Sequence, residues 1–142
     1  MSTDLYDDLF KRFGEAYGVP WELLKAQVAA ESNFDPLAVS RHGAEGLAQF
    51  MPATWREWAT RVGLPDASAF NPDAAIHVQA AYMAHLQERF GDWQKSLAAY
   101  NWGMGNLAKI VEDVEWQAQL PHETQHYVTK IMNAVKGLFG VT

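Results

Sequence analysis

Apolar residues recur every three or four positions along most of the chain, and Gly or Pro interrupts the pattern at intervals. This spacing predicts a series of short amphipathic helices, because residues three and four apart share one helix face. Gly and Pro are typical of helix ends and starts. The predicted helices are one carrying Leu5, Leu9, Phe10, Phe13 and Tyr17, capped by Ser2 or Thr3 and ended by Gly18; then Pro20 to about Glu31, Pro52 to about Val62, Pro72 to Phe90, Asp92 to about Tyr100, 107–114, and a last one from about Pro121 through Leu138.

Turn-forming residues dominate between Ser32 and Gly46, where Asn, Asp, Pro, Ser and Gly cluster. Such a composition predicts a loop. Strand signals are sparse, and we expect at most a small hairpin within 36–46. We find no internal repeat, linker or low-complexity tract. The pattern therefore predicts a mainly α protein, a compact single helical domain covering residues 1–142.

Composition narrows the class of protein. Of the 142 residues 49% are hydrophobic, which is too many for a disordered chain, and the absence of Cys excludes disulfides and thiolate chemistry. The net charge of −6 disfavours binding to nucleic acid or to an anionic membrane. No apolar run approaches the roughly 20 residues of a membrane span. The acidic first eight residues lack the pattern of a signal peptide.

One carboxylate lies on an apolar stripe. Leu24, Val28 and Glu31 are spaced i, i+4 and i+7, so they share the helix face expected to point into the core. Burial predicts that the pKa of Glu31 lies above its ordinary value of about 4.3, which suits a general acid. Periodicity alone favours a simpler reading, in which Glu31 only solvates a frayed helix end.

A long motif follows Glu31. Residues 31–54 contain the pattern E-S-x-F-x-P-x-A-x-S-x-x-G-A-x-G-L-x-Q-x-M-P-x-T, and 99–103 read A-Y-N-W-G, while 123–128 read E-T-Q-H-Y-V. The sequence resembles the soluble lytic transglycosylases, whose catalytic domain is similar to goose-type lysozyme. The resemblance extends over about residues 18–135 and implies the α+β lysozyme-like fold.

The resemblance implies a peptidoglycan lytic transglycosylase with Glu31 as the single general acid and base. Glu31 would protonate the oxygen between N-acetylmuramic acid and N-acetylglucosamine. It would then deprotonate the muramoyl C6 hydroxyl, which closes a 1,6-anhydro ring. The substrate's own N-acetyl group would replace the second carboxylate of ordinary glycosidases.

The same resemblance implies the substrate contacts. Ser40 would contact the N-acetyl group, Gln49 and Met51 would line the groove, and Tyr100 would orient Glu31. Asn101 and Glu123 would line sugar subsites, and Tyr127 would offer an aromatic wall. Core packing is the alternative reading for Tyr127. Trp102 stands where the family has a small residue, and it would narrow the wall beside Asn101 or add a stacking surface.

Three other functions remain open at this stage. The segment His122-Glu123-Thr124-Gln125-His126 matches the H-E-x-x-H pattern of zinc metalloproteases, although it lies at a predicted helix start and no third ligand follows it. A muramidase-type hydrolase of the same bond would use water and a second carboxylate, such as Asp35 or Glu45. A non-catalytic wall-binding module would keep the aromatic residues without needing Glu31.

The transglycosylase interpretation requires no metal and no cofactor. The expected partner is the peptidoglycan glycan strand, with no nucleic acid and no membrane span, and we expect a monomer. We expect action on the bacterial cell wall, either in the periplasm or outside the cell. A phage lysis enzyme, a virion-associated enzyme and a wall-remodelling enzyme of a secretion apparatus all fit.

Overall fold

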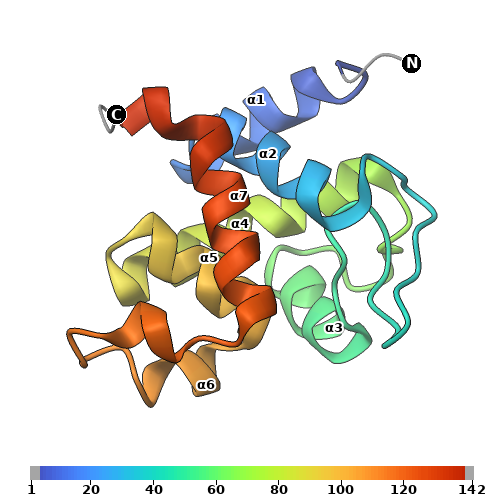
Figure 1. Ribbon diagram of the computed structural model, residues 1–142. Coiled ribbons are helices and arrows are strands. Elements are labelled where there is room, and N and C mark those ends of the chain that lie inside the picture. Colours follow the sequence, from blue (N-terminus) through green and yellow to red (C-terminus); the bar gives the residue numbers. More distant parts are fainter. Residues whose placement is uncertain (1–3, 140–142) are drawn as a thin grey trace. The chain divides into compact units, whose positions relative to one another are not determined.

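The protein is built from helices joined by turns and loops (Figure 1). The computed structural model describes residues 4–139, and side chains as far as Gly137. The helices are α1 (Asp7–Tyr17), α2 (Trp21–Ser32), α3 (Pro52–Arg61), α4 (Pro72–Phe90), α5 (Trp93–Trp102), α6 (Met104–Ala108) and α7 (His122–Val135), with the short 3₁₀ helices η1 (Trp116–Gln119) and η2 (Lys136–Phe139). The prediction of a mainly helical protein is confirmed.

Short-range chemistry sets several helix boundaries where the sequence predicts them. Gly18 ends α1 with φ of 72°, a conformation that glycine adopts without steric cost. The side chain of Asn71 accepts a hydrogen bond from the backbone N–H of Ala74, at 3.1 Å, at the start of α4. Asp92 caps α5 in the same way through the N–H of Lys95, at 3.0 Å. These side chains satisfy backbone donors that a helix leaves unpaired at its start.

Two local predictions are wrong. Leu5 precedes α1 and is 73% exposed, so it does not belong to the buried face of that helix, and the proposed caps Ser2 and Thr3 lie outside the described residues. The helix predicted over 107–114 is instead α6, which begins at Met104 and ends at Ala108. Asp113 explains part of the difference, because its carboxylate accepts a hydrogen bond from the backbone N–H of Glu115 and stabilises a turn.

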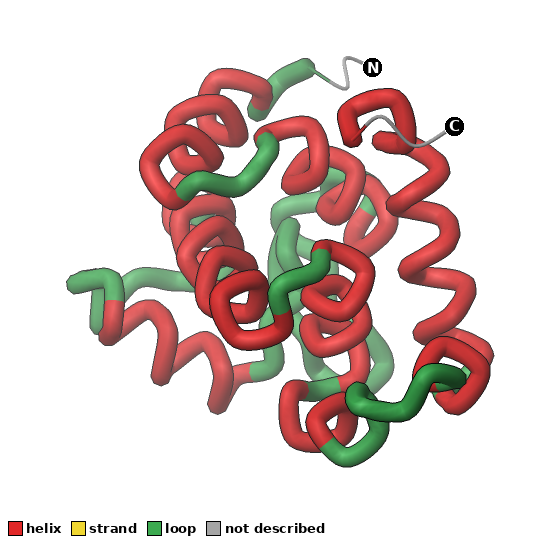
Figure 2. The backbone as a smooth tube through the Cα atoms, turned by 90° about the vertical axis from the view of Figure 1, so that its left-hand side faces the viewer, coloured by secondary structure: helices red, strands yellow, loops and turns green. Residues whose placement is uncertain are grey.

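The loop after α2 contains the only strand-like pairing in residues 4–139. Glu45 forms isolated antiparallel bridges with Val39 and with Phe50, and neither extends into a strand. Figure 2 accordingly shows helices and loops alone. We predicted at most a small hairpin within residues 36–46. The structure has only these two isolated bridges, at which the loop folds back on itself.

Backbone contacts divide the chain into two compact units that meet in sequence between Tyr82 and Met83, within α4. The prediction of one domain over 1–142 remains a prediction.

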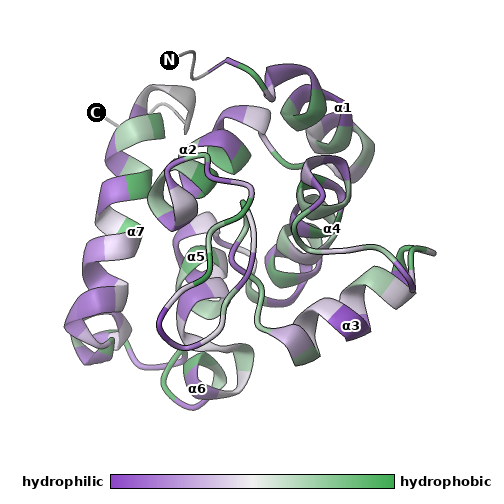
Figure 3. Cartoon of the chain, turned by 90° about the vertical axis from the view of Figure 1, so that its right-hand side faces the viewer, coloured by the Kyte–Doolittle hydropathy of each residue, from purple (hydrophilic) through white to green (hydrophobic). Residues whose placement is uncertain are grey.

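In the first unit α1 packs against α2 (Figure 1). Along α1 hydrophilic and hydrophobic residues alternate (Figure 3), as in a helix with one buried face. The largest fully buried side chains of the first unit are Phe10, Leu23, Leu24, Gln27, Leu47, Ile76 and Gln79.

The second unit is organised around α5, which packs against both α6 and α7. The contact between α5 and α7 brings together two segments that are about twenty residues apart in sequence. The fully buried large side chains of this unit are Met83, Leu86, Leu97, Leu107 and Ile131.

A histidine lies at a contact between α1 and α4 in the first unit. The ring of His77 stacks on Phe13, with 4.5 Å between centroids, and its Nε2 lies 2.7 Å from the hydroxyl of Tyr17. Desolvation lowers the pKa of His77 below its ordinary value, although the Asp73 carboxylate opposes the shift and Arg12 adds slightly to it. The neutral imidazole is therefore the form that the fold stabilises.

This histidine predicts a pH dependence of stability. Because the folded-state pKa lies below the unfolded value of about 6.5, the contribution of His77 is fully present above that pH and is lost as the pH falls below it. We expect the free energy of unfolding to decrease less between pH 7.5 and pH 5 in His77→Gln than in the wild type. Denaturant titrations at several pH values measure this slope. His42→Gln, on an exposed loop residue, is the matched control, and an equal flattening there would contradict the assignment.

Candidate active site

Glu31 lies in the last turn of α2, at the edge of the core. Leu24 and Val28, on the same face, are fully buried, whereas Glu31 is partly exposed. The helix continues one more residue and ends at Asn33, whose φ of 52° is left-handed. The predicted apolar stripe is therefore present, and it carries Glu31 from the buried interior to a position that a ligand can reach.

Ser32 attaches the end of α2 to the loop that returns toward it. Its hydroxyl lies 2.8 Å from the carbonyl oxygen of Leu47 and 3.3 Å from that of Val28. Leu47 is fully buried and Ser32 is partly exposed, so this hydrogen bond lies at the boundary of the core. The loop segment 47–51 is thereby held close to Glu31 in space as well as in the sequence motif. Sequence reasoning quoted Ser32 as part of the motif without assigning it this role.

Two predicted substrate contacts are built into the same loop. The side-chain amide of Gln49 donates to the carbonyl oxygens of Gly46, at 3.0 Å, and Ala38, at 3.2 Å. Ser40 Oγ accepts a hydrogen bond from the N–H of Ala44, at 3.0 Å, which leaves its own proton available for donation. Both side chains therefore brace the loop, and each keeps a polar atom available for another partner.

Met51, the third predicted residue of this loop, precedes α3 and is 46% exposed. An exposed thioether next to a tightly folded loop gives an adaptable apolar surface. The first unit therefore presents Glu31, Ser40, Gln49 and Met51 on α2 and the loop that follows it.

The close fold of this loop depends on Gly46. Its φ is 80°, and a Cβ atom placed there would lie 2.0 Å from the carbonyl oxygen of Ala69. Its N–H also donates to the carbonyl oxygen of Ala38, at 2.8 Å. Only a residue without a side chain fits between the backbone at Ala38 and the backbone at Ala69. At Gly43, which also lies in this loop with a positive φ of 93°, a Cβ atom would meet nothing within 4 Å.

The other predicted residues lie on α5 and α7 in the second unit. Asn101 Oδ1 accepts a 2.8 Å hydrogen bond from the hydroxyl of Thr124, which joins the end of α5 to the first turn of α7. Thr124 is buried, whereas the neighbouring Glu123 is exposed. This bond positions Asn101 and leaves its amide NH₂ as a donor. Thr124 is a positioning residue that the E-T pair in the sequence signalled only as part of a motif.

The aromatic residues of this unit that the sequence analysis names divide into two groups. Tyr100 and Trp102, on α5, are partly exposed. Tyr127 is only 7% exposed and lies on the inner face of α7, as the alternative reading of core packing predicts. Its side chain therefore contributes mainly to packing within the unit.

The H-E-x-x-H segment lies at the start of α7, as Pro121 indicated. His122 is the first residue of the helix, and His122, Glu123 and His126 are all exposed. Within residues 4–139 no group of three or more His, Cys, Asp or Glu side chains is arranged to hold a metal ion. In that part of the chain, His122, Glu123 and His126 therefore do not belong to a three-residue metal-binding group.

Comparison with known proteins assigns the family. The family model described as "Transglycosylase SLT domain" matches residues 8–122. The chain belongs to this family. Peptidoglycan transglycosylase gp16 of Escherichia phage T7 is 34% identical over an alignment of 136 residues that covers 92% of this chain and 10% of that protein. The soluble lytic murein transglycosylase of Escherichia coli K12 is 30% identical over 140 residues, covering 89% of this chain and 22% of that protein.

Solved structures of the family have the same fold. The 70-kDa soluble lytic transglycosylase of Escherichia coli superposes with a TM-score of 0.84 at 27% identity, over 97% of this chain and 25% of that one. The lytic transglycosylase Slt of Pseudomonas aeruginosa gives 0.83 at 27% identity, over 98% and 25%. The predicted lysozyme-like fold is confirmed. The chain spans no more than about a quarter of the length of these relatives.

None of the helices among residues 4–139 combines the length and the apolar character needed to cross a membrane.

The close approach of Gly46 to Ala69 predicts that alanine is tolerated less well at Gly46 than at Gly63. Gly63 has a similar φ of 84°, but a Cβ there meets no atom within 4 Å. We expect Gly63→Ala to cost about 1–2 kcal/mol of stability from its backbone conformation alone. Gly46→Ala should cost about 3 kcal/mol or more, because overpacking against Ala69 is added. Denaturant unfolding measures both, and equal losses would contradict the close approach of the two backbones.

Proposed function

We propose that this chain is a lytic transglycosylase domain that cleaves the β-1,4 bond between N-acetylmuramic acid and N-acetylglucosamine in peptidoglycan. The observation that carries the proposal is the position of Glu31, in the last turn of α2 between buried residues of that helix and the loop that follows it, within the motif of a family whose members are named lytic transglycosylases. In the Pseudomonas relative, one glutamate-to-glutamine substitution defines an inactive mutant.

Glu31 acts twice in the proposed reaction. Its protonated carboxyl first donates a proton to the glycosidic oxygen, and the N-acetylglucosamine side leaves as an alcohol. The carboxylate then accepts the proton of the muramoyl C6 hydroxyl as that oxygen bonds to the anomeric carbon. The proton returns to Glu31, no water is consumed, and the product carries a 1,6-anhydro ring. A single carboxyl group therefore completes the cycle.

The other predicted residues supply binding in this proposal. Ser40 donates its remaining proton to the N-acetyl group, the carbonyl oxygen of Gln49 accepts from a sugar, and Met51 offers an apolar surface. Thr124, which follows Glu123 in the sequence, donates a hydrogen bond to Asn101. Asn101 and Glu123 contribute polar contacts to sugars. Tyr100 keeps its predicted role in orienting Glu31. Tyr127 supports α7 from the core.

Water-dependent hydrolysis by the same fold would require a second, well-placed carboxylate. Asp35 is exposed and its Oδ1 accepts a hydrogen bond from the backbone N–H of Leu37, at 3.0 Å, so it serves the local turn. Glu45 is partly exposed, and its backbone is fixed by the bridges to Val39 and Phe50. These local roles favour intramolecular closure by the substrate over attack by water.

We also propose that the protein acts on the bacterial cell wall as a monomer, in the periplasm, outside the cell or as part of a virion. Its relatives include both a phage protein and a bacterial soluble enzyme.

The first test is Glu31→Gln. We expect lysis of purified sacculi to fall by at least about 100-fold, because the amide neither donates nor accepts the required proton. Folding should be unchanged, as judged by circular dichroism and the unfolding midpoint. Glu22→Gln, in the first turn of the same helix, is the matched control and should keep wild-type activity. Substantial turnover by Glu31→Gln would refute the assignment.

The second test identifies the product. Mass spectrometry of digested sacculi should show 1,6-anhydromuramoyl ends, which are one water lighter than reducing ends. The digestion should proceed unchanged with a strong chelator present, since no step of the proposed reaction uses a metal. Reducing ends would establish a hydrolase instead. Loss of activity with chelator, with rescue by zinc, would indicate the metalloprotease reading.

A further inference from the structure

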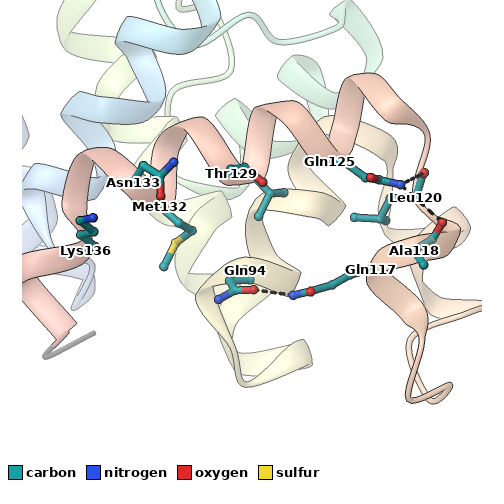
Figure 4. A pocket seen from close by; sticks show the side chains of 10 residues that line it. Gln94, Gln117, Ala118, Leu120, Gln125, Thr129, Met132, Asn133 and Lys136 are labelled. Atoms are coloured by element: carbon teal, nitrogen blue, oxygen red, sulfur yellow. Dashed lines mark hydrogen bonds between the residues drawn. The ribbon is translucent and has the colours of Figure 1, made fainter. Parts of the chain in front are cut away.

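A pocket lies along α7 in the second unit, and none of its lining residues is among those proposed above to bind glycan (Figure 4). Its volume is about 440 Å³, within the usual range of about 300–1,000 Å³ for ligand sites. Its wall is formed by one face of α7 and the first residue of η2, together with residues from the start of α5 and from η1 and the segment after it. The lining residues are Gln94, Gln117, Ala118, Leu120, Gln125, Val128, Thr129, Met132, Asn133 and Lys136.

Helix geometry separates this pocket from the proposed sugar contacts. Met132 lies nine positions after Glu123 on α7, and at about 100° per residue nine positions give two and a half turns. The two side chains therefore leave the helix on opposite sides. A ligand in the pocket occupies a different face of α7 from a sugar held by Glu123.

Side-chain amides dominate the polar part of the pocket. Gln117 donates through Nε2 to Gln94 Oε1, so Gln94 keeps its NH₂ group and Gln117 keeps its carbonyl oxygen for a ligand. Gln125 donates to the carbonyl oxygen of Leu120, at 2.9 Å, which leaves its own carbonyl oxygen as an acceptor. The pocket thus offers both donors and acceptors, which is the complement of a peptide backbone.

The remaining lining gives the pocket two different ends. Lys136 stands at one end in Figure 4, and Leu120 and Gln125 stand at the other. No ion pair holds Lys136 within the described part of the chain, so its ammonium group is available to a carboxylate. Met132, Val128 and Leu120 add apolar surface suited to small side chains.

The length of the pocket matches a short extended peptide. Gln125, in the first turn of α7, and Lys136, the first residue of η2, are eleven residues apart, which corresponds to about 16 Å at the helical rise of about 1.5 Å per residue. An extended chain advances about 3.3 Å per residue, so about four or five residues fit between these ends. None of the ten lining residues is aromatic, which makes the pocket less suited to stacking against a sugar ring.

We propose that this pocket binds a short peptide by its amides and its terminal carboxylate, and that the ligand is a stem peptide of peptidoglycan. The carboxylate pairs with Lys136, and the peptide amides meet Asn133, Thr129, Gln94 and Gln117. Met132 and Glu123 lie on different faces of α7, so the proposed peptide site is distinct from the sugar contact proposed for Glu123. This inference rests on the proposed function, and it adds a second point of attachment to the wall.

Direct binding tests the site. Glu31→Gln protein is titrated with a synthetic stem tetrapeptide that has a free terminal carboxylate, and amide chemical shifts are recorded. We expect changes centred on Thr129, Asn133 and Lys136, with Kd about tenfold higher for Lys136→Gln or for the carboxamide form of the peptide. Lys109→Gln, an exposed lysine outside the pocket, is the control and should leave Kd unchanged. No binding, shifts elsewhere, or equal weakening by Lys109→Gln would overturn the proposal.

An activity comparison separates this inference from the proposed function. Sacculi with their stem peptides are compared with glycan strands from which an amidase has removed the peptides, using protein with Glu31 intact. We expect Lys136→Gln to raise KM on intact sacculi several-fold and to leave the kinetics on stripped strands unchanged. An equal effect on both substrates would contradict peptide binding here. Failure of the wild type to produce anhydromuramoyl ends from either substrate would instead contradict the proposed function.

Discussion

The hydrogen bond from Ser32 to the carbonyl oxygen of Leu47 is the interaction on which the proposed catalytic site depends. It joins the last turn of a buried helix to the loop that returns toward it. Glu31 precedes Ser32, so the bond that attaches the last turn of α2 to this loop also restricts where the carboxyl group of Glu31 stands. Gly46 is the second half of the constraint, because only a residue without Cβ lets the loop pass against Ala69. A catalytic carboxyl group needs a fixed position. Here the Ser32–Leu47 hydrogen bond and the close approach of Gly46 to Ala69 hold the surrounding backbone in place.

The predicted substrate residues are also structural. Gln49 binds two backbone carbonyls, Ser40 accepts from Ala44, and Asn101 accepts from Thr124. Each of these side chains therefore uses one polar atom to brace its own loop or helix and presents another outward. Such double use gives a polar contact a defined direction without burying an unpaired group, which would cost about 1–3 kcal/mol.

The second unit separates two surfaces on one helix. Glu123 stands on one side of α7, and the amide-lined pocket with Lys136 at its end stands on the other. A polymer with repeating peptide branches offers ligands for both sides at once. Binding through two weak sites increases the overall affinity by raising the effective concentration at each. An enzyme that works on an insoluble network benefits from such attachment, since it stays near the next bond.

The sequence by itself determined the helical class, most helix boundaries and the residues of the catalytic motif. Those features depend on local chemistry: a proline or capping side chain at Pro52, Asn71 and Asp92, a glycine at Gly18, and a motif written in consecutive positions. Only the tertiary structure decided that Leu5 is exposed, that Tyr127 packs in the core, and that Thr124 holds Asn101. It alone revealed the pocket on α7, whose lining comes from residues 94 to 136. The reason is physical, because a pocket and a long-range hydrogen bond depend on which helices pack together, and periodicity along one helix carries no record of its neighbours.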